Sequence, residues 1–207
     1  MKKLSYRVVN QDKKEMRYLD FERGFQDKNN YLNMFSVDSK IISNYGDLDF
    51  ILNYIKYTFN KQINSSIRIY RATEDGDRAE DFHKNCDGNT DILVLIKTKN
   101  GKKFGGYTSI GFNNLNQSKE DDAAFIFSID KREIYPKIKG KKAVDSFYNL
   151  GPSFSGDSIK IFDNFLKKGG ITSKAGTNFG TNEDFQINDG SKFFGVEEIE
   201  VFEFLDS

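Results

Sequence analysis

Residues 67–110 read IRIYRATEDGDRAEDFHKNCDGNTDILVLIKTKNGKKFGGYTSI, and this stretch decides the fold. It contains the clearest helix and hairpin signals of the chain. It also contains the only histidine, His83, and the only cysteine, Cys86. The first question about the sequence is therefore whether this stretch is a catalytic site or a scaffold.

The first half of the stretch predicts a short strand followed by a short capped helix. Residues 67–70 have the composition of a strand. Asp77 can accept a free backbone N–H of the first helical turn, and Glu80, three residues on, completes a capping box. Gly88 can adopt the left-handed conformation that ends a helix. One face of this helix would carry Ala79, Phe82, His83 and Cys86.

The second half of the stretch predicts a β-hairpin. Residues 92–96 are an unbroken apolar run of strand length, so both faces of this strand are expected to be covered. Asn100 and Gly101 together are a strong hairpin signal, because both residues tolerate positive φ. The return strand carries Gly105 and Gly106. Paired glycines inside a strand indicate either a bulge or a close approach of another group to the backbone.

Outside this stretch the sequence predicts one longer helix and several short strands. Asp47 would cap the helix, whose apolar stripe consists of Leu48, Ile51, Leu52, Ile55 and Phe59. Strands are predicted at residues 123–129, 134–138, 143–148, 158–162 and 193–204. Residues 163–192 are interpreted as long loops. In the last strand, apolar residues alternate with glutamates from Ile199 onwards, which predicts one face in water.

The composition describes a globular chain with a neutral charge balance. The 207 residues include 31 basic and 31 acidic side chains, which argues against nucleic acid as the main partner. A single cysteine cannot form an internal disulfide, so a reducing compartment is expected. No apolar run follows the first residues, and no segment approaches the ~20 apolar residues that span a bilayer. We therefore expect a cytoplasmic protein without membrane insertion.

The chain is expected to divide into an N-terminal arm, residues 1–35, and a domain, residues 36–207. The arm is polar and weakly patterned, with scattered aromatic side chains. Two interpretations stay open: the arm is a partly ordered extension, or it lies along a partner protein.

No pattern in the sequence identifies a catalytic residue, a metal site or a cofactor site. His83 and Cys86 lie on one predicted helical face, whereas a catalytic Cys–His pair normally comes from separate elements and needs a third group to orient the base. One histidine and one cysteine cannot build a zinc site without several carboxylates. There is no phosphate-binding glycine loop of either common type. Lys137, Lys139, Lys141 and Lys142 are interpreted as a solvated hairpin tip.

A series of motifs resembles the TLDc domain, the module of the oxidation-resistance proteins. The resemblance covers residues 36–205 and depends on motifs that occur in the family's order. These are residues 70–76, 82–88 and 95–109, then AFIFS at 123–128 with one extra alanine, GPSF at 151–154, NFG at 178–180 and EIEVF at 198–202.

The sequence also departs from the family pattern on loops and turns. Phe112 stands near the place of a usual tryptophan. The turn after Phe154 lacks its usual histidine, and Lys167 and Lys168 lie in an unusual segment. These differences do not change the expected fold. They put in doubt, for this chain, any binding role that these loops have in relatives.

The resemblance implies an α+β fold, a two-sheet antiparallel β-sandwich with a few flanking helices. It implies no accepted enzyme mechanism and no cofactor. Family members protect cells from oxidative stress, and several bind the vacuolar-type proton-pumping ATPase (V-ATPase) and regulate it. Four positions are candidate binding residues: Gly105, Gly106, Glu198 and Glu200.

Three functions remain open from the sequence. The first is a non-catalytic protein-interaction module that regulates the V-ATPase through its peripheral subunits. The second is a structural subunit of a cytoskeletal or ciliary assembly, docked through the arm at residues 1–35. The third is an enzyme or redox sensor that uses Cys86.

Overall fold

The computed structural model describes residues 7–8, 17–18, 38–44, 46–172, 178–180 and 186–205. Most of the arm expected at residues 1–35 lies outside these residues, so its division from the domain stays a prediction. Among the described residues, no helix is both long enough and apolar enough to cross a bilayer.

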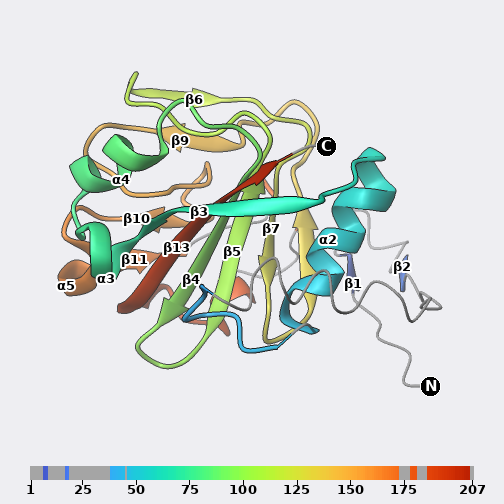
Figure 1. The fold of residues 1–207 in the computed structure, drawn as a ribbon, viewed down its shortest axis with the longest axis horizontal. Coiled ribbons are helices and arrows are strands. Elements are labelled where there is room, and N and C mark those ends of the chain that lie inside the picture. Colours follow the sequence, from blue (N-terminus) through green and yellow to red (C-terminus); the bar gives the residue numbers. More distant parts are fainter. Residues whose placement is uncertain are drawn as a thin grey trace.

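One large sheet forms the centre of the fold (Figure 1). Its strands, in spatial order, are β2 (Arg17–Tyr18), β1 (Arg7–Val8), β8 (Glu133–Pro136), β7 (Phe125–Ser128), β5 (Lys103–Thr108), β4 (Ile92–Thr98), β13 (Val196–Leu205) and β3 (Ser65–Arg71). All neighbours pair antiparallel except β1 and β8, which are parallel.

Two small sheets and five helical segments complete the part of the fold that the structure describes. The small sheets are β10 (Lys160–Ile161), β11 (Gly170–Ile171) and β12 (Phe193–Phe194), and the pair β6 (Gln117–Lys119) and β9 (Val144–Ser146). The short helices are α3 (Ala72–Asp75), α4 (Ala79–Cys86), α5 (Phe165–Lys168) and the 3-10 turn η2 (Gln186–Asn188). The longer helix, α2 (Gly46–Phe59), lies at the other end of the view from α3, α4 and α5.

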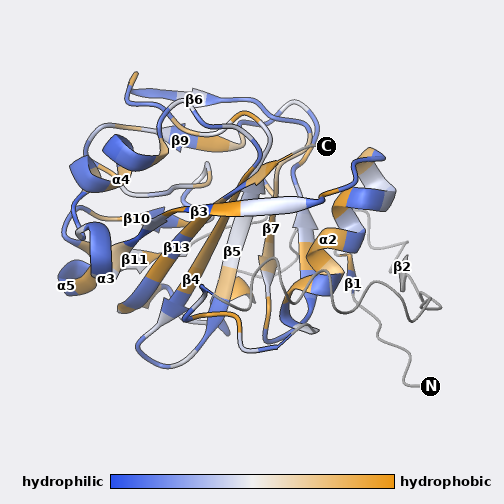
Figure 2. Cartoon of the chain, viewed as in Figure 1, coloured by the Kyte–Doolittle hydropathy of each residue, from blue (hydrophilic) through white to orange (hydrophobic). Residues whose placement is uncertain are grey.

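The two faces of the large sheet carry separate hydrophobic cores. On β4, Val94 and Ile96 pack with α4, α5 and the small sheets, whereas Leu93 and Leu95 pack with α2. All four side chains are completely buried, which confirms that both faces of residues 92–96 are covered. The short helices on one face of the sheet are hydrophilic where they face outwards: in Figure 2, α3, α4 and α5 are mostly hydrophilic on the side in view.

This arrangement confirms the predicted α+β class and its sandwich-like packing. The second layer differs from the expectation in one respect, because it is divided between two small sheets of three and two strands. Of these short strands, β9, β10 and β12 lie within predicted strand ranges, whereas β6 and β11 were not predicted, because strands of two or three residues carry little alternation. The segment 163–192, interpreted as long loops, accordingly contains α5, β11 and η2.

The β4–β5 hairpin forms as predicted, with a different turn. The Gly101 N–H donates to the Thr98 carbonyl at 2.8 Å, and Gly101 alone takes positive φ, at 78°. This is the three-residue loop with a left-handed glycine, one of the common hairpin connections. The local signal therefore located the turn correctly and left its type undetermined.

At Gly105 and Gly106 other groups approach the backbone closely, as one of the two predictions has it. The alternative prediction, a bulge, is wrong. The register from Ile92 opposite Thr108 to Lys97 opposite Lys103 runs without a shift. A Cβ atom at Gly105 would lie 1.9 Å from the Val94 carbonyl oxygen. One at Gly106 would lie 2.3 Å from the ring of Phe154.

The N-cap of helix α4 is Arg78, one residue after the predicted cap at Asp77. Asp77 and Glu80 do not form the capping box; instead the Asp81 carboxylate accepts the Arg78 N–H at 3.1 Å. Asp163, far along the chain, accepts the Ala79 N–H at 3.0 Å. The predicted apolar face is buried, and Gly88 follows the helix at φ 87°.

Candidate interaction site

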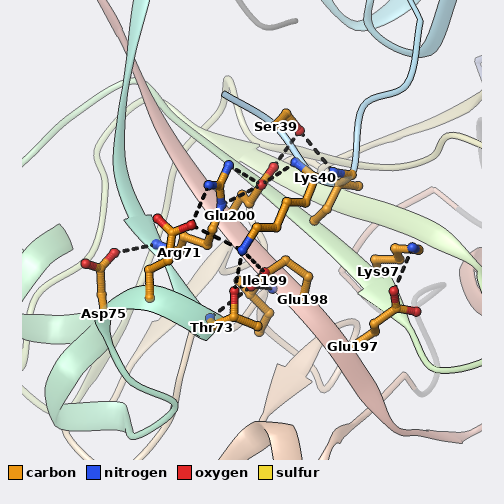
Figure 3. Close-up of polar contacts among 12 residues, drawn as sticks. Ser39, Lys40, Arg71, Thr73, Asp75, Lys97, Glu197, Glu198, Ile199 and Glu200 are labelled. Atoms are coloured by element: carbon orange, nitrogen blue, oxygen red, sulfur yellow. Dashed lines mark hydrogen bonds and ion pairs between the residues drawn. The ribbon is translucent and has the colours of Figure 1, made fainter. Parts of the chain in front are cut away.

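Glu200 lies on β13 directly opposite Arg71 on β3, and it is completely buried. Its Oε1 atom accepts hydrogen bonds from Arg71 Nε at 2.9 Å and from the Lys40 backbone N–H at 2.7 Å. Its Oε2 atom accepts one from the Ser39 hydroxyl at 2.5 Å (Figure 3). One carboxylate thus joins two strands to the leading segment, residues 38–44, which precedes α2.

The guanidinium of Arg71 is the second centre of this cluster. Its Nη1 donates to Glu74 Oε1 at 2.8 Å, and its Nη2 lies 2.8 Å from Glu200 Oε1 and donates to the Asp38 carbonyl. Burying a charge is costly unless it is paired and hydrogen-bonded. Arg71, only 4% exposed, meets both conditions and fixes the start of the leading segment against the sheet.

Glu198 caps the short helix α3 from the neighbouring strand. It is 3% exposed, and its carboxylate accepts the backbone N–H of Thr73 at 3.1 Å and the Thr73 hydroxyl. Lys40 Nζ lies 3.8 Å from Glu198 and donates to the Thr73 hydroxyl at 3.0 Å. A carboxylate is favourable at a helix N-terminus because backbone N–H groups are free there.

These positions correct the prediction that the glutamates of the last strand face water. The alternation is present, but β13 lies between β4 and β3, and the leading segment contacts Glu200. Glu198 and Glu200 are consequently buried and paired, while exposed Glu197 makes a surface ion pair with Lys97 at 2.7 Å.

The four candidate binding residues fall into two groups. Glu198 and Glu200 belong to the charged cluster just described. Gly105 is opposite Leu95, which is opposite Glu200, so this glycine lies two strands away within the same sheet. Gly105 and Gly106 carry no functional side chain and are positions of close packing. The assignment of all four as partner-binding residues stays a prediction.

Sequence reasoning missed the residues that partner the two glutamates: Asp38, Ser39, Lys40, Arg71 and Thr73. Only Arg71 offered a signal, since a cationic residue at the end of a predicted strand requires a carboxylate when the strand is covered. No local sequence pattern in the leading segment predicts these contacts.

Because of the charged cluster, the stability of the fold decreases at acidic pH. Hydrogen bonds from Arg71 and then Lys40 lower the pKa of Glu74 to about 2, from an ordinary 4.5. A depressed carboxyl pKa means that the folded state binds fewer protons than the unfolded state. This stabilisation is complete above pH 4.5 and is lost as the pH falls towards 2.

We expect the urea midpoint of the wild type to fall between pH 5 and pH 3 more steeply than that of Glu74→Gln. The two proteins should approach each other in stability as the pH falls towards 2, since Glu74 of the wild type then becomes protonated in the folded state as well. Parallel pH profiles would contradict the role given to Glu74.

His83 joins helix α4 to the loop after β9. Its Nδ1 lies 2.7 Å from Asp87 Oδ1, and its Nε2 lies 2.9 Å from the Phe147 carbonyl oxygen. Both ring nitrogens therefore have partners other than the Cys86 thiol. The geometry does not form a Cys–His pair, and it agrees with the interpretation of His83 and Cys86 as packing residues.

Cys86 is completely buried in the core between the sheet and α4. Burial, followed by the nearby carboxylates of Asp87 and Asp75, raises the pKa of the thiol well above its ordinary value. A thiol in this state is a weak nucleophile, because the thiolate is the reactive form.

We expect Cys86 to react with a thiol-specific dye no faster than the domain unfolds. Labelling followed over hours in buffer and over seconds in denaturant is the measurement, with glutathione as the exposed-thiol control. Rapid labelling of the folded protein would support the redox hypothesis instead.

Comparison with protein families matches the chain to a domain family. The model of the TLDc domain matches residues 36–205, which include the leading segment, both cores and the whole charged cluster. No curated protein matches the sequence closely enough to count as a relative.

Proposed function

The chain belongs to the TLDc domain family, and on that premise we propose that it is a non-catalytic protein-interaction module of the cytoplasm. Its proposed partners are the peripheral subunits of the V-ATPase, and its proposed effects are on the activity of that pump and on resistance to oxidative stress. The family match over residues 36–205 is the observation that carries this proposal.

The buried polar side chains of the site make their contacts within the chain, which supports the role of the domain as a scaffold. Glu198 and Glu200 hold α3 and the leading segment, and His83 holds the loop at Phe147. These side chains are committed to contacts within the chain and are under 10% exposed. A scaffold of this kind offers its surface to a partner while its interior maintains the shape.

Affinity capture from native lysate tests the proposal. Tagged wild-type protein is expected to retain the peripheral subunits of the pump, which mass spectrometry identifies. When added to isolated membranes that contain the pump, it is expected to change their rate of ATP hydrolysis. The tag alone is the control. Consistent absence of every pump subunit from the captured material would reject the pump as partner.

A second candidate is a structural subunit docked through the arm, and contacts within the chain locate the part of the arm that the structure describes. Arg7 and Val8 pair with β8, and Arg7 Nη1 lies 3.3 Å from Glu133 Oε1. Part of the arm therefore meets the sheet at the edge away from β3. Deletion of residues 1–35 should then abolish localisation to an assembly while the domain stays folded, and unchanged localisation would remove this candidate.

A further inference from the structure

One end of the domain carries an excess of lysine, although the charges of the whole chain balance. This end lies away from α2 and consists of the small sheet β10–β11–β12, helix α5, the start of β13 and the tip of the β4–β5 hairpin (Figure 1). The segments that build it are residues 97–103, 157–172 and 188–197. They contain eight lysines, no arginine and four carboxylates, so this end is locally basic.

All four carboxylates of these segments already have partners. Three of them form ion pairs with lysines of the same segments: Asp157 with Lys160, Asp189 with Lys102, and Glu197 with Lys97. The fourth, Asp163, accepts the Ala79 N–H at 3.0 Å and the Asn164 amide at 2.7 Å. Lys103 pairs with Asp47 of α2. Within the part of the chain that the structure describes, four exposed lysines of this end therefore make no ion pair: Lys99, Lys167, Lys168 and Lys192.

Lysines without ion pairs occur elsewhere on the surface, but here they adjoin an exposed phenylalanine. Phe193 is 69% exposed, more than any other large hydrophobic side chain that the structure describes. Its neighbour Phe194 points into the core, where its ring centre lies 5.1 Å from that of Phe104. Successive side chains of a strand point to opposite faces, so Phe193 points away from the core.

Two of these lysines lie directly at the exposed ring and at the link that follows it. Lys192 Nζ lies 5.3 Å from the centre of the Phe193 ring. The Lys99 N–H donates to the Gly195 carbonyl at 2.8 Å. The Lys99 side chain runs along Gly195, because its Cδ would lie 2.9 Å from a Cβ atom at that glycine.

Lys168 is brought to the same place by the glycine that follows it. Gly169 lies so close to β12 that a Cβ atom there would be 2.0 Å from the Phe194 carbonyl oxygen. Lys168 is the last residue of α5, whereas Asp77 adjoins the first, since the Phe165 N–H donates to the Asp77 carbonyl at 2.9 Å. We call the resulting set the lysine patch: Lys99, Lys168, Lys192 and Phe193.

The residue types of the lysine patch favour an anionic membrane surface over a protein as its partner. The cores of protein interfaces are enriched in arginine and depleted in lysine, and this end of the domain has no arginine. Anionic lipids attract lysines near the bilayer surface without requiring a fitted shape. Lysine stems also lie along apolar groups while the ammonium stays in water, and an aromatic ring suits the boundary between headgroups and acyl chains.

We propose that the lysine patch docks the domain on a membrane surface that carries anionic lipids. Lys99, Lys168 and Lys192 pair with the anionic headgroups, and Phe193 enters the boundary between headgroups and acyl chains. The docking is peripheral and reversible, because a few lysines and one ring make a weak anchor. The inference adds a partner to the proposed function and does not depend on it.

Co-sedimentation with lipid vesicles tests the proposal. The probes are phosphatidylcholine vesicles with about 30% phosphatidylserine and vesicles of phosphatidylcholine alone. Wild type should bind the anionic vesicles saturably and less tightly as salt rises, and it should bind the neutral vesicles at least about tenfold more weakly. The triple variant Lys99→Gln, Lys168→Gln, Lys192→Gln should weaken binding to the anionic vesicles about tenfold or more.

The contribution of the ring is measured separately. Phe193→Ser removes an exposed apolar side chain and leaves all lysines in place. It should weaken binding to the anionic vesicles about threefold or more, with the salt dependence of the wild type. Binding as tight as that of the wild type would overturn the part given to Phe193.

The matched control is the triple variant Lys84→Gln, Lys139→Gln, Lys141→Gln. It removes the same charge from exposed lysines that also lack ion pairs among the described residues, on α4 and on the loop between β8 and β9. It should bind the anionic vesicles within about twofold of wild type. All substituted side chains are exposed, so thermal unfolding should show that every variant folds like wild type.

Three results would overturn the proposal: no binding of wild type to the anionic vesicles, equal binding to both kinds of vesicle, or equal weakening in the two triple variants. The vesicles contain no protein, so this test is separate from that of the proposed function. If wild type captures pump subunits but does not bind the vesicles, the lysine patch is rejected and the function stands. If wild type binds the vesicles but captures no pump subunit, the pump is rejected and the lysine patch stands.

Discussion

Replacing Glu200 with alanine is expected to destabilise the domain by about 3–5 kcal/mol, because it breaks a buried ion pair by removing one partner. Arg71 would keep its charge at 4% exposure and lose its contacts at 2.8 and 2.9 Å. The Lys40 N–H and the Ser39 hydroxyl would lose their acceptor as well. Urea unfolding followed by circular dichroism measures this loss.

Two further variants identify the cause of that loss. Glu200→Gln keeps an oxygen acceptor and the side-chain volume, so it should cost less than the alanine variant. Glu197→Ala removes a carboxylate from the same strand whose partner, Lys97, is on the surface. Exposed pairs contribute about 0–1 kcal/mol, so this control should stay near wild type. A loss at Glu200→Ala as small as that at Glu197→Ala would refute the role of the buried pair.

Gly105→Ala is expected to cost about 3 kcal/mol or more, at the upper end of what overpacking does to a core. The new Cβ atom would lie 1.9 Å from the carbonyl oxygen of Val94 and 2.9 Å from the ring of Phe127. The first of these atoms is backbone in the neighbouring strand. Relief therefore requires β4 and β5 to move apart in the middle of the sheet.

Two other glycines supply the comparison. Gly106→Ala would contact the end of the Phe154 ring at 2.3 Å, and a smaller side chain at that position, as in Phe154→Leu, should restore part of its stability. Gly195→Ala would meet only the flexible side chain of Lys99, at 2.9 Å, and should be nearly neutral. Thermal unfolding of the three variants is the measurement. Similar melting temperatures for Gly105→Ala and Gly195→Ala would contradict the close approach of the strands.

The elements that sequence reasoning found are those with local signals. Helix α2 has a stripe of regularly spaced apolar residues, and the β4–β5 hairpin has an apolar run followed by Asn100 and Gly101. Such patterns depend on residues within one turn or one strand pair. The structure places both elements where the sequence put them, with shifts of a residue or two at their ends.

The candidate site depends on contacts that no local pattern contains. Glu200 meets Arg71 across 129 positions of sequence and Ser39 across 161. An alternating strand looks the same whether its polar residues face water or a covering segment. The burial of Glu198 and Glu200 therefore followed only from the neighbours of β13, which the sequence did not reveal.

A hollow beside α4 was likewise not predictable from local sequence patterns. Arg78, Lys84 and Tyr148 are ordinary surface residues in the sequence, on a helix and on a loop about 70 positions apart. They line one hollow because His83 Nε2 lies 2.9 Å from the Phe147 carbonyl oxygen and joins α4 to the loop of Tyr148, a contact that no local pattern contains. By contrast His83 and Cys86, the rarest residues in the sequence, are packing residues in the structure.

The attachment of the leading segment to Glu200 is tested most directly by hydrogen exchange at the backbone amide of Lys40. This N–H donates to Glu200 Oε1 at 2.7 Å, so it should exchange slowly in the wild type. In Glu200→Ala it should exchange as fast as in an unstructured peptide, while the Ile96 amide in β4 keeps the protection that the remaining stability allows. A Lys40 amide that is unprotected in the wild type, or equally protected in both proteins, would show that Glu200 does not hold this segment to the sheet.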